Sequence, residues 1–526
     1  MYIPSPAYYH GIVTLPMTNM EDDMDTWKET VLSIVKNTTL THQQAMMNLA
    51  DAAVSQEGFW ETTPEFDRLH QLGIVCDMSE PRAAYAPRYA LPDYEKLMRE
   101  GCEFLRIKPP KSLDEAIHAL QIFYLQVPSV THMPVYLGNI DMLLDPFVTD
   151  ANEARSKIAR FLDFIGKALP NSFCHANLGP EETLAGRLIV EIETERQEAV
   201  PGITLLYDKD ITSQSFAEAC VQCALACAKP SFANHSVYSQ QHLDSPKGYG
   251  IASCYNALAV GGGAYTLSRV VLKRAADHAK DIHEFLDSVL PEAVTALSSF
   301  MDAKIRFLVE ESHFFSSSFL VKEGFLHRDR FTGMFGVVGL HEAVNILMEK
   351  EGKDARYGVD EEADALGKLI MDTLESLVQS HSNRYCEISG GHFVLHAQVG
   401  IDSDIGISPG ARIAIGEEIP LYNHLRHAGK FHKYFPSGTG DIFPFDSTYQ
   451  KNPSSVLDII NGGFGAGMQY LSTYSADSDV IRITGYLAKR SEMEALDHGE
   501  VVQQNNTIWG LGEVHNGRIL ERKVRS

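Results

Sequence analysis

The sequence predicts an α/β protein with a barrel or a wound sheet at its centre. Short apolar runs typical of buried strands alternate with segments of helical periodicity, and buried strands between helices are typical of α/β architectures. No internal repeat, low-complexity stretch or flexible linker divides the 526 residues. We therefore expect a single domain, although length alone would allow two or three.

Helical periodicity is clearest in five segments. They span residues 24–55, 154–169, 213–228, 267–311 and 361–381. Apolar residues recur every three or four positions in these segments, which places them on one helix face. We expect Thr212 or Ser213 to cap the third helix and Pro291 to break the fourth segment into two or three helices.

Four apolar runs predict buried strands. They are 202–207 (GITLLY), 187–192 (RLIVEI), 392–399 (HFVLHAQV) and 480–484. The run 187–192 fits a helix equally well. Residues 405–449 are rich in Gly, Pro, His and aromatic side chains, and we expect them to form ordered loops.

Composition and charge narrow the class of protein. The formal charge of −24 argues against nucleic acid or an anionic membrane as a partner. The N-terminus lacks the basic-then-apolar order of a signal peptide, and no apolar run approaches the roughly 18 residues of a membrane span. Eight cysteines at irregular spacing indicate reduced thiols. We therefore expect a cytoplasmic, globular, metabolic protein.

Three of the cysteines, Cys220, Cys223 and Cys227, superficially suggest an iron–sulfur site. Their order is CxxCxxxC, whereas radical-generating iron–sulfur enzymes have CxxxCxxC. At helical spacing the three sulfurs form one apolar stripe, which predicts a buried helix face. We expect no metal in this chain.

Two short segments are candidates for the chemistry. Cys254 lies in GIASCYNAL (250–258), ahead of three consecutive glycines, and glycine on both sides suits a tight loop whose tip enters a cavity. Gly485 lies in VIRITGYL (480–487). Alone, the cysteine also fits a small buried hydrophobe, and the glycine also fits a turn at the end of a strand.

Taken together and in this order, the two segments resemble the glycyl radical enzymes, in which a loop cysteine precedes a glycine in R-[IV]-x-G-Y. Three further segments resemble that family in the same order: GNIDMLLDPF (138–147), PGITL (201–205) and SPGARIAIGEEIP (408–420). Asn139 and Met142 depart from the usual Arg and Gln. The phrases SCYNALAVGGGAYTL, DRFTGMFGVVGL and RITGYLAKRSE are most similar to the YjjI-like branch.

The resemblance implies a fold, a cofactor and partners. The fold is a ten-stranded β/α barrel of two antiparallel five-stranded halves that enclose the Cys and Gly loops. Its parts are a helical region (1–129), the barrel core with the Cys loop (130–460), and the glycyl radical region with an extended tail (461–526). A separate iron–sulfur activase that uses S-adenosylmethionine makes the radical, Arg482 and Tyr486 position the Gly485 loop, and a homodimer is the usual assembly.

Glycine and cysteine suit this chemistry for physical reasons. A backbone Cα radical is stabilised between an amide nitrogen and a carbonyl when the centre is planar, and only glycine lacks a side chain that resists this. The S–H bond of cysteine is weak enough to exchange a hydrogen atom with that radical. We therefore predict that Gly485 stores the radical and that Cys254 passes it to a small substrate in a site closed to water.

Three departures separate the chain from named subclasses. Ser253 stands where pyruvate formate-lyases have a second cysteine. Asn256 stands where diol, glycerol and choline lyases have a glutamate base, and a neutral amide cannot take a proton. No cysteine follows Cys386, whereas anaerobic ribonucleotide reductases have a C-terminal zinc cluster.

Polar residues near the two loops are candidates for substrate binding. A histidine there could donate to a hydroxyl or carbonyl oxygen, and Glu387 could be the missing base. Each candidate also fits a structural polar group. The candidates are His175, Asn177, Asn234, His235, Asn256, Glu387, His392 and His396.

Three functions fit these features. The first is a radical lyase or related enzyme that cleaves or rearranges a C–C or C–O bond of a small polar metabolite. The second is a non-catalytic relative that binds a metabolite, although such a protein has no use for both Cys254 and Gly485. The third is a radical reductase that consumes an external electron donor.

Overall fold

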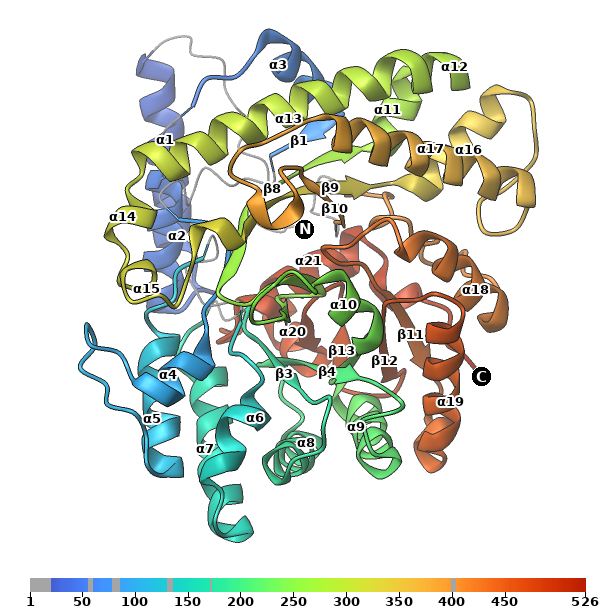
Figure 1. Ribbon diagram of the computed structural model, residues 1–526. Helices are drawn as coiled ribbons and strands as arrows, with labels where there is room; N and C mark the ends of the chain where they lie inside the picture. The colour runs from blue at the N-terminus through green and yellow to red at the C-terminus, as the bar shows by residue number, and fades with distance from the viewer. Residues whose placement is uncertain (1–19, 55–59, 78–85, 130–135, 171–172, 399–403) are drawn as a thin grey trace.

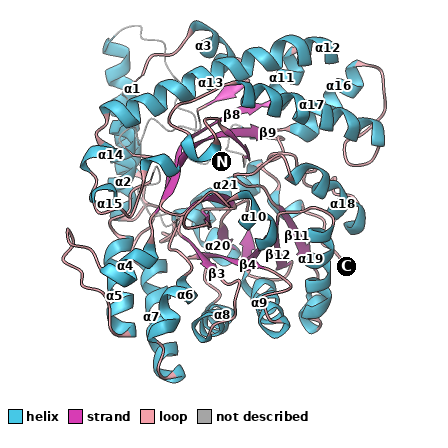
Figure 2. Ribbon diagram, viewed as in Figure 1, coloured by secondary structure: helices cyan, strands magenta, loops and turns pink. Residues whose placement is uncertain are grey.

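Two five-stranded sheets, flanked by helices, form the centre of the computed structural model. The structure describes residues 20–54, 60–77, 86–129, 136–170, 173–398 and 404–526, apart from the side chains of 20–26, Val54 and Asn516. Figure 1 shows one sheet above the other, with helices on the outer side of each, and Figure 2 separates the strands from the surrounding helices. The predicted α/β class is confirmed.

The first sheet has the order β11-β12-β5-β4-β3. β3, β4 and β5 run parallel, β12 runs antiparallel to β5, and β11 is parallel to β12. β4 is the run GITLLY, whose continuous apolar character suits a strand covered on both faces. The strands are β3 (His175–Leu178), β4 (Gly202–Tyr207), β5 (Ser231–Asn234), β11 (Asp441–Phe445) and β12 (Tyr470–Ser475).

The second sheet has the order β1-β8-β9-β10, with β2 also paired to β8. β8, β9 and β10 are parallel, and the two N-terminal strands run antiparallel to β8. Segment 1–129 thus contributes strands to this central sheet as well as helices. The strands are β1 (Val75–Cys76), β2 (Tyr89–Leu91), β8 (Gly262–Val271), β9 (Phe331–Val338) and β10 (Val394–Ala397).

Two antiparallel hairpins stand apart from the sheets and carry the predicted chemical residues at their turns. The first consists of β6 (Tyr249–Ala252) and β7 (Asn256–Ala259). The second consists of β13 (Val480–Arg482) and β14 (Leu487–Lys489). The segment that follows the second hairpin, residues 490–526, is called the tail below.

Helices cover the outer faces of both sheets (Figure 1). α13 contacts β8, α17 contacts β10 and α11 contacts β9, while α9 and α19 contact β12. The helices on the second sheet are α11 (Leu272–His278), α13 (Leu290–Arg306), α16 (Leu340–Lys350) and α17 (Glu361–Ser380). Those beside the first sheet are α5 (Leu113–Tyr124), α7 (Ala151–Lys167), α8 (Leu184–Arg196), α9 (Gln214–Cys227) and α19 (Pro453–Gly465).

The other helices lie around this central part. α9 begins where predicted, because the Ser213 side chain accepts a hydrogen bond from the Phe216 N–H. The three cysteines of this helix are all buried, as its apolar stripe predicts. The remaining helices are α1 (Met20–Lys36), α2 (His42–Val54), α3 (Pro64–Gln71), α4 (Tyr94–Glu100), α6 (Ile140–Leu144), α10 (His235–Gln241), α12 (Ile282–Glu284), α14 (Phe314–Ser317), α15 (Phe319–Lys322), α18 (Leu421–His432), α20 (Arg490–Asp497) and α21 (Asn505–Asn516).

The described part of segment 24–55 is helical, as predicted, and contains α1 and α2. The run 187–192, for which a strand and a helix were both open, lies in helix α8. Segment 267–311 starts as the end of β8, where every residue is buried. Pro291 does not break the helix, because it lies in the first turn of α13 behind a π-helical turn, where its missing N–H is tolerated.

Segment 405–449 is not all loop, because it contains α18 and β11. Leu425, Ala428 and Phe431 form the buried face of α18, but its glycine and histidines hid that periodicity. The predicted closure of the two sheets into one barrel is not seen. Within the described ranges, each strand ladder stays inside its own sheet or hairpin.

Candidate functional site

Cys254 lies at the tip of the β6–β7 hairpin. Residues 253–255 form its turn, and Ser253 adopts the left-handed backbone conformation with a φ of 58°. This conformation is uncommon for a residue that has a Cβ, and it is found in tight turns and functional sites. Only 6% of the Cys254 surface is exposed. The predicted loop with a buried cysteine at its tip is therefore present.

Side chains of the first sheet hold this hairpin in place. Asn177 on β3 accepts a hydrogen bond from the Ile251 N–H at 2.9 Å and donates one to the Ile251 carbonyl, also at 2.9 Å. The Tyr470 hydroxyl, on β12, donates to the carbonyl of Cys254 itself at 2.9 Å. Asn177 is thus a backbone clamp rather than a free substrate ligand, since both ends of its amide are used.

His175 begins a buried chain of polar groups that ends at the same carbonyl. Its Nε2 lies 2.7 Å from the Thr204 hydroxyl, which lies 2.9 Å from the Tyr470 hydroxyl. Burial, with a smaller contribution from the Arg482 charge, lowers the pKa of His175 to about 3. His175 is therefore neutral near pH 7 and acts here as a hydrogen-bonding residue.

Gly485 lies in the turn of the β13–β14 hairpin and faces Cys254. A Cβ built on Gly485 would overlap both the Cβ and the Sγ of Cys254. The glycine Cα and the thiol are therefore in van der Waals contact, although the two residues lie far apart in the sequence. Glycine is required by this close approach of side chain to backbone.

A cavity of about 10 Å³ lies beside Gly485. That volume is at the lower limit for one water molecule. Residues from both hairpins and from the tail line it. The lining residues are Phe173, Cys174, Ala199, Gly202, Ser253, Arg482, Gly485, Tyr486, Leu487 and Asn506.

Arg482 and Tyr486 flank the glycine as predicted, but they have different surroundings. Arg482 is 1% exposed, donates to the Ala228 carbonyl at 2.9 Å, and has its pKa lowered by burial. Tyr486 is half-buried, with its ring centroid 5.5 Å from that of Phe173 and 5.9 Å from that of Trp509 in the tail. Arg482 therefore ties the loop to the turn between α9 and β5, and Tyr486 ties it to the tail.

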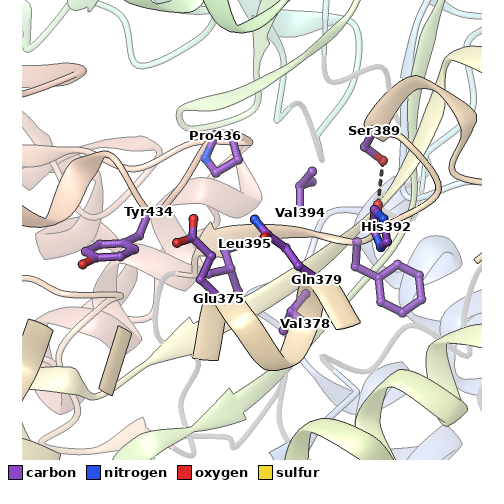
Figure 3. Close-up of a pocket in the computed structure, with 10 residues that line it drawn as sticks. Glu375, Val378, Gln379, Ser389, His392, Val394, Leu395, Tyr434 and Pro436 are labelled. Carbon is purple, nitrogen blue, oxygen red and sulfur yellow. Dashed lines mark hydrogen bonds between the residues drawn. The ribbon is translucent and has the colours of Figure 1, made fainter. Parts of the chain in front are cut away.

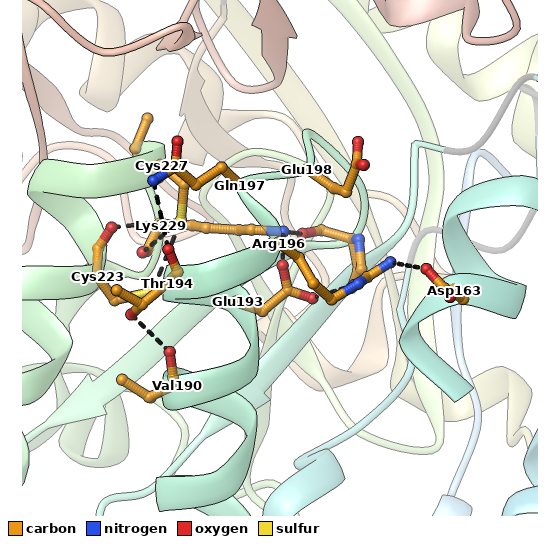
Figure 4. Close-up of polar contacts among 12 residues, drawn as sticks. Asp163, Val190, Glu193, Thr194, Arg196, Gln197, Glu198, Cys223, Cys227 and Lys229 are labelled. Atoms are coloured by element: carbon orange, nitrogen blue, oxygen red, sulfur yellow. Dashed lines mark hydrogen bonds and ion pairs between the residues drawn. The ribbon is translucent and has the colours of Figure 1, made fainter. Parts of the chain in front are cut away.

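A buried ion pair supports the turn that receives Arg482 (Figure 4). Lys229 and Glu193 are both fully buried, and Lys229 Nζ lies 2.7 Å from Glu193 and donates to the Pro201 carbonyl at 3.0 Å. Arg196 pairs with the other oxygen of Glu193 at 2.8 Å. Lys229 directly follows Ala228, so this network fixes the carbonyl that Arg482 contacts.

Positive charge surrounds the Cys254 thiol. Burial raises the pKa of Cys254, and the charges of Arg88, Arg412 and Arg482 oppose that rise. The Arg412 guanidinium lies 5.4 Å from the centroid of the Tyr255 ring, next to Cys254 in the hairpin turn. Arg412 is half-buried, its Nε donates to the Gly440 carbonyl, and it makes no ion pair with any described residue. Such a cation beside a reactive group is suited to bind an anion.

Three other candidates make structural contacts near the hairpin. Asn256 donates to the Ala252 carbonyl at 3.0 Å and so closes the turn. Asn234 donates at 3.3 Å to a backbone carbonyl in the loop before β12. His235 Nδ1 lies 3.0 Å from the Tyr249 hydroxyl at the base of the hairpin. These contacts support the Cys254 hairpin. The hydrogen bond that Asn256 makes does not turn its amide into a base.

Among the remaining candidates, His396 lies beside the Cys254 hairpin, with its ring centroid 5.7 Å from that of Tyr255. Glu387 is exposed and pairs with Arg328 at 2.9 Å on the surface. His396 is buried, its pKa is lowered to about 3 by burial, and its Nδ1 lies 3.3 Å from the Ser437 carbonyl. His392 lines a different cavity of about 260 Å³ (Figure 3), together with Glu375, Val378, Gln379, Ser389, Phe393, Val394, Leu395, Tyr434 and Pro436.

Sequence reasoning did not identify several residues of the site. Thr204 and Tyr470 lie within ordinary apolar strands, and only the sheet pairing brings them to the hairpin. Arg412 lies in segment 408–420, whose family resemblance was the one available signal. Nothing in the sequence marked the aromatic contact between Trp509 and Tyr486.

Comparison with known proteins identifies the family. A model of the glycyl radical enzyme YjjI-like family matches residues 40–525. The chain belongs to this family. It is 44% identical over 501 residues to an uncharacterized protein of Haemophilus influenzae, covering 94% of this chain and 97% of that protein. It is 38% identical over 496 residues to the uncharacterized protein YjjI of Escherichia coli, covering 94% and 95%.

Solved structures share the fold of this YjjI-like glycyl radical enzyme. The anaerobic ribonucleotide reductase of Thermotoga maritima superposes with a TM-score of 0.66 at 12% identity, covering 92% of this chain and 99% of that chain. A structure describing 1,2-propanediol dehydration in Roseburia inulinivorans gives 0.64 at 9% identity, covering 95% and 89%. A glycyl radical enzyme from Archaeoglobus fulgidus gives 0.60 at 12% identity, covering 96% and 78%. At these identities the likeness shows the fold alone.

Membership in the YjjI-like family makes the chain an enzyme of the glycyl radical class. Such enzymes use a glycyl radical and are in general activated by a radical S-adenosylmethionine activase. No helix in the described part of the chain is long and apolar enough to cross a bilayer. Among those same residues, no group of His, Cys, Asp or Glu is arranged to hold a metal ion.

Proposed function

We propose that Gly485 stores the radical and that Cys254 delivers it to a small polar metabolite. One observation supports this most strongly: the Gly485 Cα and the Cys254 thiol are in contact. Cys254 is buried, which protects a radical from water and other reactants. A separate S-adenosylmethionine-dependent activase would remove one hydrogen atom from the Gly485 Cα to generate the radical.

The hydrogen-atom steps balance with these two residues alone. The Gly485 radical takes the hydrogen of the Cys254 S–H bond, which leaves a C–H bond on glycine and a thiyl radical on sulfur. The thiyl then takes a hydrogen atom from a substrate C–H bond. A C–C or C–O bond of the substrate radical then breaks or rearranges. The product radical takes a hydrogen atom from the Cys254 S–H bond, which restores the thiyl radical. The thiyl takes a hydrogen atom from the Gly485 Cα, which regenerates the glycyl radical.

The surroundings of Cys254 limit the accompanying acid–base chemistry. Asn256 uses its amide to donate to the Ala252 carbonyl and has no proton-accepting group of useful basicity. His175 and His396 have pKa values of about 3, which makes both weak bases near pH 7. These observations favour a reaction that needs no strong base at the hairpin. A reductase that uses an external donor is the alternative, and a product of lower oxidation state than its substrate would distinguish it.

We further propose that the substrate carries a negative charge. Arg412 beside Tyr255, with Arg88 and Arg482 also acting on the thiol, supports recognition of a carboxylate or phosphate. Small carboxylates and phosphate monoesters should raise the melting temperature of the wild type, and their neutral amides and alcohols should not. The shift should disappear in Arg412→Gln. Equal shifts with charged and neutral compounds would contradict an anionic substrate.

Barrel closure, oligomeric state and cellular compartment are also proposed. We propose that the two five-stranded sheets form the halves of one ten-stranded barrel in a single domain, as the shared fold with glycyl radical enzymes supports. We also propose a homodimer in the cytoplasm. The irregular, unpaired cysteines support a reducing compartment.

Electron paramagnetic resonance after anaerobic activation tests the radical directly. The sample contains the protein, its cognate activase, S-adenosylmethionine and a reductant. We expect a doublet in the wild type and in Cys254→Ala, and no doublet in Gly485→Ala. Because the Cβ introduced by Gly485→Ala would collide with Cys254, glycine labelled with ¹³C at Cα provides the second test. Its label should split the wild-type signal further, and an unsplit signal would place the radical elsewhere.

Activase competence is the control in that experiment. S-adenosylmethionine cleavage by the activase alone shows that it is active. A competent activase that produces no doublet in the wild type would overturn the radical assignment and favour the metabolite-binding alternative.

A further inference from the structure

The tail makes several contacts with the Gly485 hairpin. It includes α20, α21, a 3₁₀ turn (Ile519–Glu521) and the residues that follow. The predicted chemistry uses no residue of the tail, yet Trp509 and Asn506 already border the glycine loop. A further residue of the tail contacts the backbone next to Gly485 directly.

Arg522 makes the most direct contact. Its Nη1 donates to the Arg482 carbonyl at 2.6 Å, and its Nη2 donates to the Ile483 carbonyl. These two carbonyls belong to the end of β13, from which the chain enters the Gly485 turn. Two parallel N–H groups on adjacent carbonyls fix both the position and the orientation of that peptide segment.

Burying the Arg522 guanidinium costs free energy. Arg522 is 7% exposed, its pKa is lowered by burial, and it has no ion pair with any described residue. A buried guanidinium without a carboxylate partner is unfavourable unless its hydrogen bonds are satisfied. Two of its acceptors are backbone carbonyls of the Gly485 hairpin, and the Tyr474 side chain is a further partner. Part of the energy of burying Arg522 therefore depends on the hairpin being in place.

The chain on either side of Arg522 is itself fixed to the body of the protein. The Arg525 N–H donates to the Pro444 carbonyl at 2.7 Å, and its Nη2 donates to His424 Nδ1 at 2.8 Å. Before Arg522, the Asn505 N–H donates to the Pro170 carbonyl at 2.7 Å. The tail thus connects α7 to β11 across the hairpin, with Arg522 between the two attachments.

We propose that Arg522 is a positioning residue that holds the Gly485 loop against Cys254. This inference rests on the proposed radical at Gly485. With Arg522 in place, the Gly485 Cα stays within reach of the thiol, and a hydrogen atom can pass between them. Without Arg522, the hairpin moves away from Cys254 more often, so transfer becomes slower while access of the activase to Gly485 improves. These opposite changes separate positioning from simple loss of stability.

Deuterium exchange of the radical measures that contact. In D₂O the Cys254 thiol carries deuterium, which it gives to the Gly485 radical to form a glycine with one H and one D. When the thiyl takes back the hydrogen, deuterium remains on the radical centre and the doublet collapses. The collapse rate therefore reports transfer between Gly485 and Cys254, and Cys254→Ala should keep its doublet.

The variants are Arg522→Gln, Arg522→Lys and, as the matched control, Arg518→Ala. Arg518 lies in the same tail segment but is exposed and pairs with Glu521. We expect collapse about tenfold slower in Arg522→Gln, because losing one charge-assisted hydrogen bond shifts an equilibrium by about that factor. Activation should be faster in the same variant, and Arg522→Lys should be intermediate. Wild-type rates in Arg522→Gln would overturn the proposal.

Amide hydrogen exchange of the resting protein gives a second result that needs no radical. Arg522→Gln should lose about tenfold protection in residues 480–489 and little in residues 249–259, whereas Arg518→Ala should lose none. Unchanged protection of 480–489 would overturn the positioning role. A wild type that shows this protection but never forms a doublet would instead overturn the proposed function, so the two failures are distinguishable.

Discussion

The two hairpins that meet at the site are anchored in different ways. The Cys254 hairpin is held by side chains of the first sheet, through Asn177 and Tyr470. The Gly485 hairpin receives one anchor from Arg482, and the tail supplies the others, Arg522 and Trp509. The Cys254 hairpin is thus fixed by the core of the fold, whereas the Gly485 hairpin depends on the tail. A glycine that an activase must reach is better placed on a hairpin held by the tail than on one held by the core.

Removing the buried ion pair should have the largest effect on the Gly485 side. Lys229→Met leaves Glu193 buried without that partner, and we expect a loss of about 3–5 kcal/mol in the free energy of unfolding. Amide protection should fall more in 480–489 than in 249–259, because Lys229 adjoins the carbonyl that Arg482 contacts. Denaturant unfolding and hydrogen exchange measure both effects.

The double variant Lys229→Met, Glu193→Leu controls for the pair itself. Replacing both charges by apolar groups of similar size should restore most of the loss. A single variant as stable as the wild type would show that the ion pair does not support this hairpin.

Asn177→Ala should produce the reverse pattern at the other hairpin. It leaves the N–H and carbonyl of Ile251 without their partners, and we expect a loss of about 2–4 kcal/mol in the free energy of unfolding. Hydrogen exchange should increase in 249–259 before it increases in 480–489. Asn461→Ala, which removes a less buried hydrogen bond to Tyr207, should cost less, and equal protection of both hairpins would remove the distinction between them.

Acid should weaken the chain of groups behind Cys254. The pKa of His175 is about 3 in the folded protein against 6.5 for the free group, so the unfolded state binds more protons between those values. Stability is therefore complete above pH 6.5 and falls as the pH drops toward 3. As the pH drops toward 3, the free energy of unfolding should fall less steeply in His175→Gln than in the wild type. The two slopes should differ by about 1.4 kcal/mol per pH unit. Equal slopes from denaturant unfolding at several pH values would contradict a neutral buried His175.

Glu387→Gln should have the smallest effect. The residue is exposed and pairs with Arg328 on the surface, and such pairs contribute about 0–1 kcal/mol. Neither hairpin should change its protection, and the yield of radical should match the wild type. A large loss of turnover with normal radical yield would restore Glu387 as the base that the sequence suggested.

The sequence predicted the fold class and the two residues in contact because both leave local signals. Buried strands such as 202–207 are continuously apolar, and the cysteine and glycine lie in distinctive motifs. The supporting residues leave no such signal. Thr204 and Tyr470 acquire their role only through strand pairing, and Arg522 through the path of the tail. Segment 405–449 was mistaken for loop because three histidines and a glycine lie among the apolar residues of α18 and interrupt the pattern of its buried face.

The cavity beside Gly485 has a consequence for behaviour in air. Its volume of about 10 Å³ leaves space for no more than one water molecule. Most of the surroundings of Gly485 are therefore protein atoms and not solvent. The decay of a Gly485 radical after exposure to oxygen should then depend on how often the tail and the two hairpins separate. Its rate would report that opening.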